Sequence, residues 1–313
     1  MSNEPVLLTK KYKDHTIQNV VDDLRVDSLP FNAYSVHTQP IRNLDITIQV
    51  LDEETETVIE TVSGRSSGGS MRVESSSLIR RSGSLEVAFD PEFFPSPKSL
   101  VWFGNIFRVY VGIQDLSMEN HTVNFLLGTF WIDEAALSVD NTSSTITIEL
   151  SDKMTKYDED ELENMMKIPI DIPISEAIKK AMEDFGETKF GYIQKSLPNE
   201  VVPYTLEFGV GSTKISIIEK LRDMYMDYTC GYNVKGEFEF YRIEVQKETA
   251  YQKPKWSFNN DILDGKDLIV DFKEGYRLKD IKNRILIIGE TSEKSGITPK
   301  GEVRITDSKN LLT

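Results

Sequence analysis

Residues Ser144-Thr145-Ile146-Thr147-Ile148-Glu149-Leu150 alternate polar and apolar side chains without a break. Because successive side chains of a β-strand point to opposite faces of its sheet, this alternation predicts a strand with one buried face. Shorter or less regular versions of the pattern, separated by turn residues, occur earlier in the chain, at 46–50, 58–62, 84–89, 106–111 and 124–132. Several short strands with turns between them favour a β-barrel or a β-sandwich.

After about residue 157 the strand pattern gives way to a mixture of helices and strands. Apolar side chains recur at i, i+3 and i+4 from Ile174 to Phe185, which predicts an amphipathic helix. We expect Ser175 to cap its N-terminus and Gly186 to end it.

A second helix is predicted by the same stripe from Ile217 to Tyr228. The candidates for its N-cap are Ser216, which has capping-box spacing to Glu219, and, one turn earlier, Ser212 or Thr213. A β-hairpin should follow, with strands at 231–234 and 237–241 and a turn at Lys235-Gly236. Later strands are predicted at 268–270, 283–289 and 302–305. No short-period internal repeat is visible.

Composition excludes several classes of protein. The formal net charge of −15 disfavours binding to nucleic acid or to an anionic membrane surface. No run of about 18 apolar residues predicts a transmembrane helix. The polar N-terminus lacks the apolar segment of a signal peptide, and Cys230 is the single cysteine, so we expect folding in a reducing cytoplasm.

Few residues carry recognisable chemistry. His15, His37 and His121 lack partners at metal-ligand spacing, and Cys230 is expected to be a packed residue at a helix end. The Gly/Ser-rich stretch 63–70 reads as a flexible loop and lacks the lysine of a phosphate-binding loop. We therefore predict no catalytic residue, no metal ligand and no cofactor.

Carboxylates offer the one enzymatic alternative. Asp158, Asp160 and Glu161 could be proposed as a glycosidase pair, which needs two carboxylates across a sugar cleft. They belong to an acidic cluster at 158–163, and such a run of like charges is typical of a solvated face. A virion-associated cell-wall hydrolase is thus an alternative and not the main reading.

Four features occur in an order that resembles the phage tail/baseplate hub protein family. The first is a Leu-Gly-x-Phe strand at 127–133, and the second is an alternating strand at 144–152 that ends in Asp. The third is a helix-plus-hairpin unit at 211–241. The fourth is a late Asn-Arg strand that ends in Gly, at 280–289, preceded by residues 256–258. The resemblance covers roughly residues 41 to 313.

The resemblance implies a mainly β fold with an α+β insertion and two tail-tube-like β-barrel domains, the second split by the helix-rich segment. The domain boundaries would then be an N-terminal docking arm at 1–40, a first barrel at 41–157, a mixed α/β segment at 158–250 and a C-terminal β segment at 251–313 that completes the second barrel. The arm carries few periodic apolar residues, so we expect it to dock on another part of an assembly.

The same resemblance implies a non-enzymatic structural protein of the virion, assembled in the host cytoplasm. Its partners would be copies of itself in a ring, with a trimer favoured, together with the tail tube and other baseplate or tail-tip proteins. DNA would pass through the ring without specific binding, and there would be no membrane anchor. No lytic or spike domain is expected after the last strand.

Alternatives from the same setting are a distal-tail ring or a receptor-binding adaptor. A hub predicts threefold assembly with two barrel-like parts, whereas a distal-tail ring predicts sixfold assembly with one. A secreted or surface binding module of a bacterium is disfavoured because no signal peptide is visible.

Overall fold

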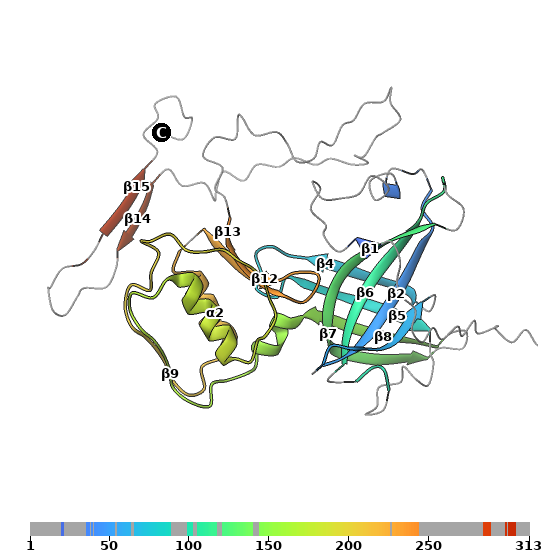
Figure 1. Cartoon of the computed structure of the whole chain (residues 1–313), viewed down its shortest axis with the longest axis horizontal. Coiled ribbons are helices and arrows are strands. Elements are labelled where there is room, and N and C mark those ends of the chain that lie inside the picture. The colour runs from blue at the N-terminus through green and yellow to red at the C-terminus, as the bar shows by residue number, and fades with distance from the viewer. Residues whose placement is uncertain are drawn as a thin grey trace, which may run out of the picture. The chain divides into compact units, whose positions relative to one another are not determined.

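The computed structural model describes residues 20–21, 36–37, 39, 41–53, 55–63, 66–88, 99–102, 105–117, 121–139, 144–225, 227–243, 284–288, 298 and 300–304. These residues belong to two compact units, Met1–Trp256 and Ser257–Thr313. The first unit contains a large antiparallel sheet and a smaller region with two α-helices (Figure 1).

The large sheet has eight strands, seven of which follow the spatial order β3-β2-β6-β7-β8-β5-β4. Their bounds are β1 (Val20–Val21), β2 (Leu44–Asp52), β3 (Val58–Ser63), β4 (Ser66–Val73), β5 (Arg81–Ala88), β6 (Asn105–Gln114), β7 (Thr122–Val139) and β8 (Ser144–Asp152). The alternation of polar and apolar residues at 144–150 is confirmed as a strand with one buried face, because Ile146, Ile148 and Leu150 are buried in β8. They form one core with apolar residues of β2, β5 and β6 such as Val50, Val87 and Phe107.

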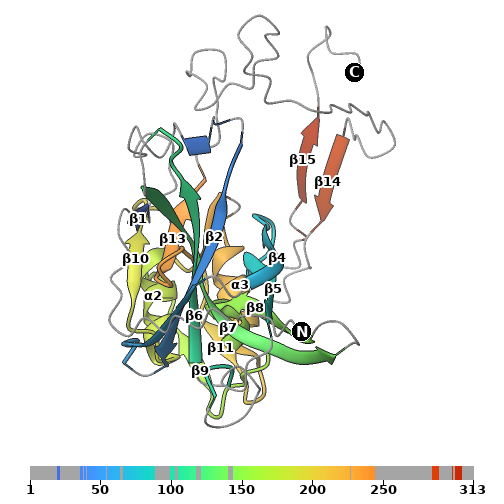
Figure 2. The same cartoon turned by 90° about the vertical axis from the view of Figure 1, so that its right-hand side faces the viewer.

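The mainly β class is confirmed, but a closed barrel is not observed. Figure 2 shows the sheet curling on itself, yet no pairing joins β3 to β4 among the described residues. These two edge strands are neighbours in sequence. Only three Cα–Cα steps separate Ser63 at the end of β3 from Ser66 at the start of β4, so their Cα atoms lie within about 11 Å of each other although the strands do not pair. The first barrel is therefore an open, strongly curled sheet in the residues that the structure describes.

The Gly/Ser-rich stretch corrects the expectation of a flexible loop. From Ser66 onward it forms β4, which pairs antiparallel with β5, and Ser70 and Ser84 approach to 3.1 Å between hydroxyl oxygens. A Cβ atom on Gly69 would lie 2.5 Å from the carbonyl oxygen of Ser84. Glycine thus permits a close approach between strands here, and pairing with β5 outweighs the low strand preference of Gly and Ser.

The described residues of the N-terminal arm contact the large sheet of the same chain. Val20–Val21 pairs parallel with Asn124 and Phe125 of β7, and Val36 is buried beside Ile113 and Phe125. The described part of the arm thus contacts its own chain, and docking of the arm on another part of an assembly stays a prediction. The boundary at residue 40 stays a prediction.

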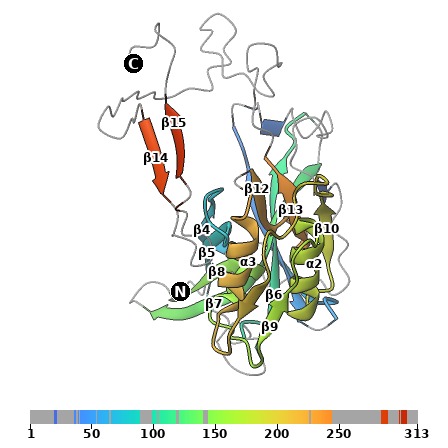
Figure 3. The same ribbon diagram turned by 90° about the vertical axis from the view of Figure 1, so that its left-hand side faces the viewer.

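The described residues that follow β8 mix short strands and helices, and the domain boundaries at 158 and 250 stay predictions. Its elements are the 3-10 helix η2 (Lys153–Tyr157), β9 (Met166–Ile168), α2 (Ile174–Asp184), β10 (Phe190–Ile193), β11 (Leu206–Phe208), α3 (Lys214–Arg222), β12 (Tyr228–Tyr232) and β13 (Phe238–Arg242). Figure 3 shows α2 and α3 beside the β12–β13 hairpin. We call residues 153–243 the α/β segment.

The first predicted helix is present as α2, and Gly186 follows its end with a positive φ of 91°. The expected cap is wrong. Pro173 occupies the N-cap position, while the backbone N–H of Ser175 donates to the hydroxyl of Ser196 at 2.8 Å and the Ser175 hydroxyl accepts from the Ser196 N–H at 3.2 Å. The serine therefore joins the helix to a neighbouring loop.

The second helix, α3, is shorter than its apolar stripe. Ile217, Ile218 and Leu221 are buried, but the helix ends at Arg222 and Tyr228 belongs to β12. Thr213 occupies the N-cap position without a side-chain hydrogen bond. Tyr228 still reaches the same core from a strand, which is why its spacing imitated a helix.

The predicted hairpin is confirmed; its first strand begins three residues earlier than expected and its second strand is shifted by one residue. β12 and β13 pair from Tyr228↔Arg242 to Tyr232↔Phe238, and Gly236 in the turn has a positive φ of 77°. Cys230 lies within β12 and not at a helix end, which corrects its predicted position.

The α/β segment contains an internal repeat that the sequence conceals. Residues 161–182 and 201–222 have matching structures at a constant spacing of 40 residues, and β9 pairs antiparallel with β11 around Lys167↔Glu207. The equivalent residues Asp171 and Gly211 both have positive φ, 68° and 83°.

Hydrogen bonds repeat in the same way. The N–H of Leu162 donates to the carbonyl of Ser212 at 2.9 Å, and its equivalent Val202 donates to Ile172 at 2.8 Å. The two copies therefore surround an approximate twofold axis. They share only two identical residue pairs, Ile178/Ile218 and Lys180/Lys220, which explains why no sequence repeat was seen.

In the second unit, β14 (Arg284–Ile288) and β15 (Lys300–Arg304) form a two-stranded antiparallel ribbon. β14 falls within the stretch predicted at 283–289, whereas β15 overlaps the one predicted at 302–305 but begins two residues earlier; every residue of both strands is exposed. The strand predicted at 268–270 lies outside the described residues. The second barrel therefore stays a prediction.

Candidate functional site: a cationic pocket beside the hairpin

A buried carboxylate attaches the α/β segment to the large sheet. Asp152, at the end of β8, is 1% exposed and accepts hydrogen bonds from the backbone N–H groups of Arg80 at 2.8 Å, Arg81 at 2.9 Å and Met154 at 3.0 Å. Burial raises the pKa of Asp152, and the three backbone donors oppose that shift. The contact fixes the start of η2 against the β4–β5 turn.

The two arginines beside this carboxylate continue the attachment. The guanidinium of Arg80 donates to the hydroxyl of Thr229 on β12, and that of Arg81 donates to the carbonyl of Tyr232. Burial lowers the pKa of Arg81, and the nearby Asp152 opposes that shift. Each arginine thus donates from its guanidinium to the hairpin, which makes this region structural, although the Nε of Arg80 is buried without a partner.

A second buried network lies on the other side of η2. Glu187 is 2% exposed and accepts from the hydroxyl of Tyr232 and from the Lys153 ammonium at 3.0 Å. Lys153 also lies 5.6 Å from the centre of the Trp131 ring on β7, so it connects the segment to the sheet. Burial raises the pKa of Tyr157 in this network to about 12.

The turn of the β12–β13 hairpin lies on the outer face of the large sheet. Val234 is buried against Tyr110 and Leu126, and the hydroxyl of Thr129 donates to the carbonyl of Val234 at 2.9 Å. A Cβ on Gly236 would lie 3.2 Å from the Thr129 side chain, so the turn approaches the sheet closely. The contact forms one wall of a pocket.

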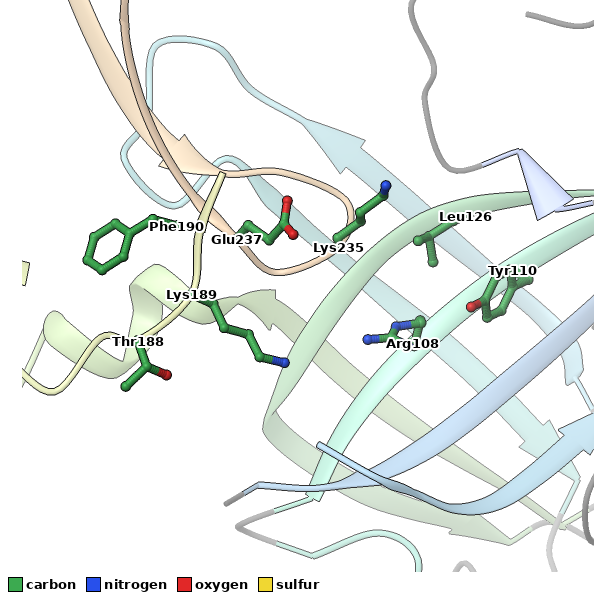
Figure 4. Close-up of a pocket in the computed structure, with 8 residues that line it drawn as sticks. All are labelled: Arg108, Tyr110, Leu126, Thr188, Lys189, Phe190, Lys235 and Glu237. Atoms are coloured by element: carbon green, nitrogen blue, oxygen red, sulfur yellow. The ribbon is translucent and has the colours of Figure 1, made fainter. Parts of the chain in front are cut away.

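This pocket is the candidate functional site, with a volume of about 480 Å³. Figure 4 shows its lining side chains, which come from β6, β7, the loop that leads into β10, and the hairpin. They are Arg108, Tyr110, Leu126, Thr188, Lys189, Phe190, Lys235 and Glu237. Three cationic groups and one carboxylate thus surround the cavity, in a chain whose net charge is −15.

Arg108 is held in place by its strand. It pairs in register with Gln49 of β2 and Thr129 of β7, and its neighbours Phe107 and Val109 point into the core. Alternation therefore places Arg108 on the outer face, toward the pocket. Its Nε atom is buried and has no hydrogen-bond partner.

Two further charged groups of the pocket, Lys189 and Glu237, are held by contacts within the protein. The Lys189 ammonium forms an ion pair with Glu56, which follows β2. Glu237 accepts from the side-chain amide of Asn233 at 2.9 Å, and that amide also contacts Glu239. The pocket can therefore bind an acidic group without first rearranging its loops.

Sequence reasoning missed this pocket entirely. Arg108, Lys189 and Lys235 are separated by dozens of residues and belong to no motif. The one available signal was the predicted Lys235-Gly236 turn, which places a lysine at the tip of a hairpin. Nothing in the sequence indicates which strand that tip touches.

The carboxylates proposed for a hydrolase do not form a pair across a cleft. Asp158 and Glu161 are exposed, and Asp160 forms an ion pair with Lys214 at 2.5 Å. Residues 160–163 of the run line a second cavity of about 440 Å³, whose other lining residues include Lys180 and Lys214. Asp158, Glu159, Glu161 and Glu163 are exposed, as expected of a solvated acidic face, whereas Asp160 is half-buried.

The other singled-out residues show no shared site. His37 lies 4.7 Å from the ring of Phe125, and His121 lies 3.9 Å from Asp115, while His15 falls outside the described residues. Burial raises the pKa of Cys230 to about 12, so its thiol stays protonated. Among the described residues, no group of three or more His, Cys, Asp or Glu could hold a metal ion. No helix in that same part of the chain is long and apolar enough to cross a membrane.

No protein-family model matches this sequence, and no curated protein matches it. Solved structures do match. The tail protein from Neisseria meningitidis MC58 superposes with a TM-score of 0.53 and 7% identity, over 85% of this chain and 69% of that chain. The 43 kDa tail protein of prophage MuSo2 from Shewanella oneidensis matches with a TM-score of 0.41 and 14% identity, over 64% of this chain and 56% of that chain. A half-lidded PdpA–VgrG complex of Francisella matches with a TM-score of 0.47 and 12% identity, over 88% of this chain and 44% of that chain.

Of these three, the Neisseria likeness alone exceeds a TM-score of 0.5, and at 7% identity it shows a similar fold. The resemblance to phage tail proteins that the sequence motifs predicted is therefore confirmed at the level of the fold. This chain spans 56% of the length of the Shewanella protein and 44% of the Francisella chain.

Proposed function

We propose that this chain is a structural, non-enzymatic subunit of a phage tail or baseplate. Its copies form a hub ring, a trimer, that joins the tail tube to the tail tip or spike and surrounds the path of the DNA. The observation that carries this proposal is the fold, which is similar to that of a solved tail protein over 85% of the chain. The order of the sequence motifs supports the hub in particular.

The edges of the large sheet fit such an assembly. Among the described residues, β3 pairs with β2 alone and β4 pairs with β5 alone, so each has one unpaired side. Val58 and Ile59 at the start of β3 are 49% and 46% exposed. Strand edges with unpaired N–H and C=O groups pair readily with another chain unless they are covered, and neighbouring copies in a ring would cover them.

The charge of the chain fits a path for DNA. A lumen rich in Lys and Arg would bind phosphate and retain the duplex, whereas a neutral or acidic lumen repels it. With 51 acidic and 36 basic residues, this chain can present such a lumen. We expect the inner wall of the ring to be neutral or negative.

Native mass spectrometry of the purified protein tests the ring. The expected result is three times the 35.7 kDa mass of the chain as the dominant species at physiological salt. A sixfold mass would favour a distal-tail ring or an adaptor. A monomer at all concentrations up to about 100 µM would overturn the proposed assembly, because ring contacts of standard size give affinities tighter than this.

A further inference from the structure

We propose that the cationic pocket binds the acidic run Asp158–Glu163 of a neighbouring copy of this chain. This inference rests on the proposed ring assembly, and it names one contact by which the copies hold one another. Three cationic side chains, Arg108, Lys189 and Lys235, line the pocket beside a single carboxylate, Glu237. The run supplies carboxylates on the same chain.

The acidic run is presented by a rigid support. Tyr157, directly before it, is buried, and within it Leu162 donates from its N–H to the carbonyl of Ser212 at 2.9 Å. Glu161 is bridged to Thr213 on the backbone. Asp158, Glu159 and Glu163 are exposed between and beside these fixed points. Carboxylates on an ordered backbone lose little entropy on docking, which favours a specific contact.

The pocket suits a side chain of a protein better than a bare ion. Its walls include Tyr110, Leu126 and Phe190 beside the cations, so it can cover the methylene groups of Asp and Glu while it pairs with their carboxylates. A volume of about 480 Å³ exceeds what one small ion fills. A guanidinium such as Arg108 is suited to pairing with a carboxylate through two parallel hydrogen bonds.

The pocket and the run are different surfaces of the chain. Their cavities share no lining residue, and some of their charges already have partners inside the chain: Asp160 pairs with Lys214, Lys189 pairs with Glu56, and Lys235 also has a partner. Two complementary surfaces on one chain produce a head-to-tail contact, which closes into a ring when the rotation between copies permits. Charge complementarity also steers such subunits together and fixes their register.

Charge reversal tests this contact. In Arg108→Glu we expect self-association to weaken by about tenfold or more, because the change removes a cation and adds a repelled carboxylate. The matched control is Lys220→Glu, which makes the same change of charge at an exposed residue of α3 that lines neither cavity. The control should retain the wild-type assembly. The neutral variant Arg108→Gln is measured beside it. An unchanged melting temperature of this variant shows that loss of the arginine does not impair folding.

Restoration identifies the occupant. The double change Glu159→Lys with Glu161→Lys should weaken association to a similar degree, and combining it with Arg108→Glu should recover at least part of the lost ring. Carbodiimide treatment of a mixture of isotope-labelled and unlabelled protein should join Lys235 or Lys189 to residues 158–163 between chains. Both readouts use the intact chain.

The outcomes separate this inference from the proposed function. A wild-type ring that persists in Arg108→Glu overturns the docking contact and leaves the ring in place. Weakening by Arg108→Glu without recovery in the charge-swapped combination also overturns it, since the pocket then takes another partner, such as a different tail protein or phosphate. A wild-type protein that stays monomeric overturns the proposed assembly together with this contact.

Discussion

Leu221→Asp places a charge in the core of the α/β segment. Leu221 on α3 is 0% exposed and belongs to the cluster that joins both helices to the hairpin. Truncating a buried leucine costs about 3–5 kcal/mol. At pH 7 the introduced carboxyl must also remain neutral against an ordinary pKa of about 3.9, which at about 1.4 kcal/mol per unit costs roughly 4 kcal/mol more. The sum, about 7–9 kcal/mol, is comparable with the whole stability of a typical domain.

The pH dependence separates the two contributions. The introduced carboxyl has a raised pKa in the folded state, so the folded state holds its proton more tightly than the unfolded chain and stability falls as pH rises above about 4. Urea unfolding of Leu221→Asp and of Leu221→Ala should therefore differ by roughly 4 kcal/mol at pH 7 and by little at pH 4. Lys220→Asp, on the exposed side of the same helix, should cost less than about 1 kcal/mol. Equal midpoints for Leu221→Asp and the wild type at pH 7 would show that α3 does not face a core.

Three further outcomes follow from the structure. Asp152→Ala removes the acceptor of three backbone N–H groups and should destabilise the protein by about 2–5 kcal/mol in urea unfolding; a loss below about 0.5 kcal/mol would contradict the attachment. Gly236→Val forces a β-branched residue to a φ of 77° near Thr129 and should lower stability by at least about 1–2 kcal/mol, and an unchanged melting temperature would refute the turn geometry. The purified protein should produce no band of lysis in a zymogram with cell walls, whereas a band that disappears in Asp158→Asn would support the hydrolase alternative.

The strands and helices of the first unit were largely predictable because their signals are local. Alternation identified β8, and the i, i+3, i+4 stripe identified α2 and the core face of α3. The errors arose where a distant partner decides the structure. Ser66–Val73 has the composition of a loop and becomes a strand because β5 pairs with it. Tyr228 continues a helical stripe and yet lies in β12.

The pocket could not be predicted for the same physical reason. Arg108 reads as a polar residue on the solvated face of a strand, and Lys235 as the tip of a hairpin. Their meeting depends on how the α/β segment is attached through Asp152 and the hairpin turn, which is tertiary packing between segments far apart in sequence. The internal repeat was hidden likewise, because backbone hydrogen bonds maintain it and only two residue pairs, Ile178/Ile218 and Lys180/Lys220, are identical.

Electron microscopy of the purified full chain tests the central claim most directly. The account predicts class averages of a closed ring with threefold symmetry and an open centre wide enough for duplex DNA, roughly 20 Å across, with an inner wall that is not rich in Lys and Arg. Particles that remain single subunits would contradict the hub assembly. So would a ring whose centre is closed by protein or lined mainly by basic side chains.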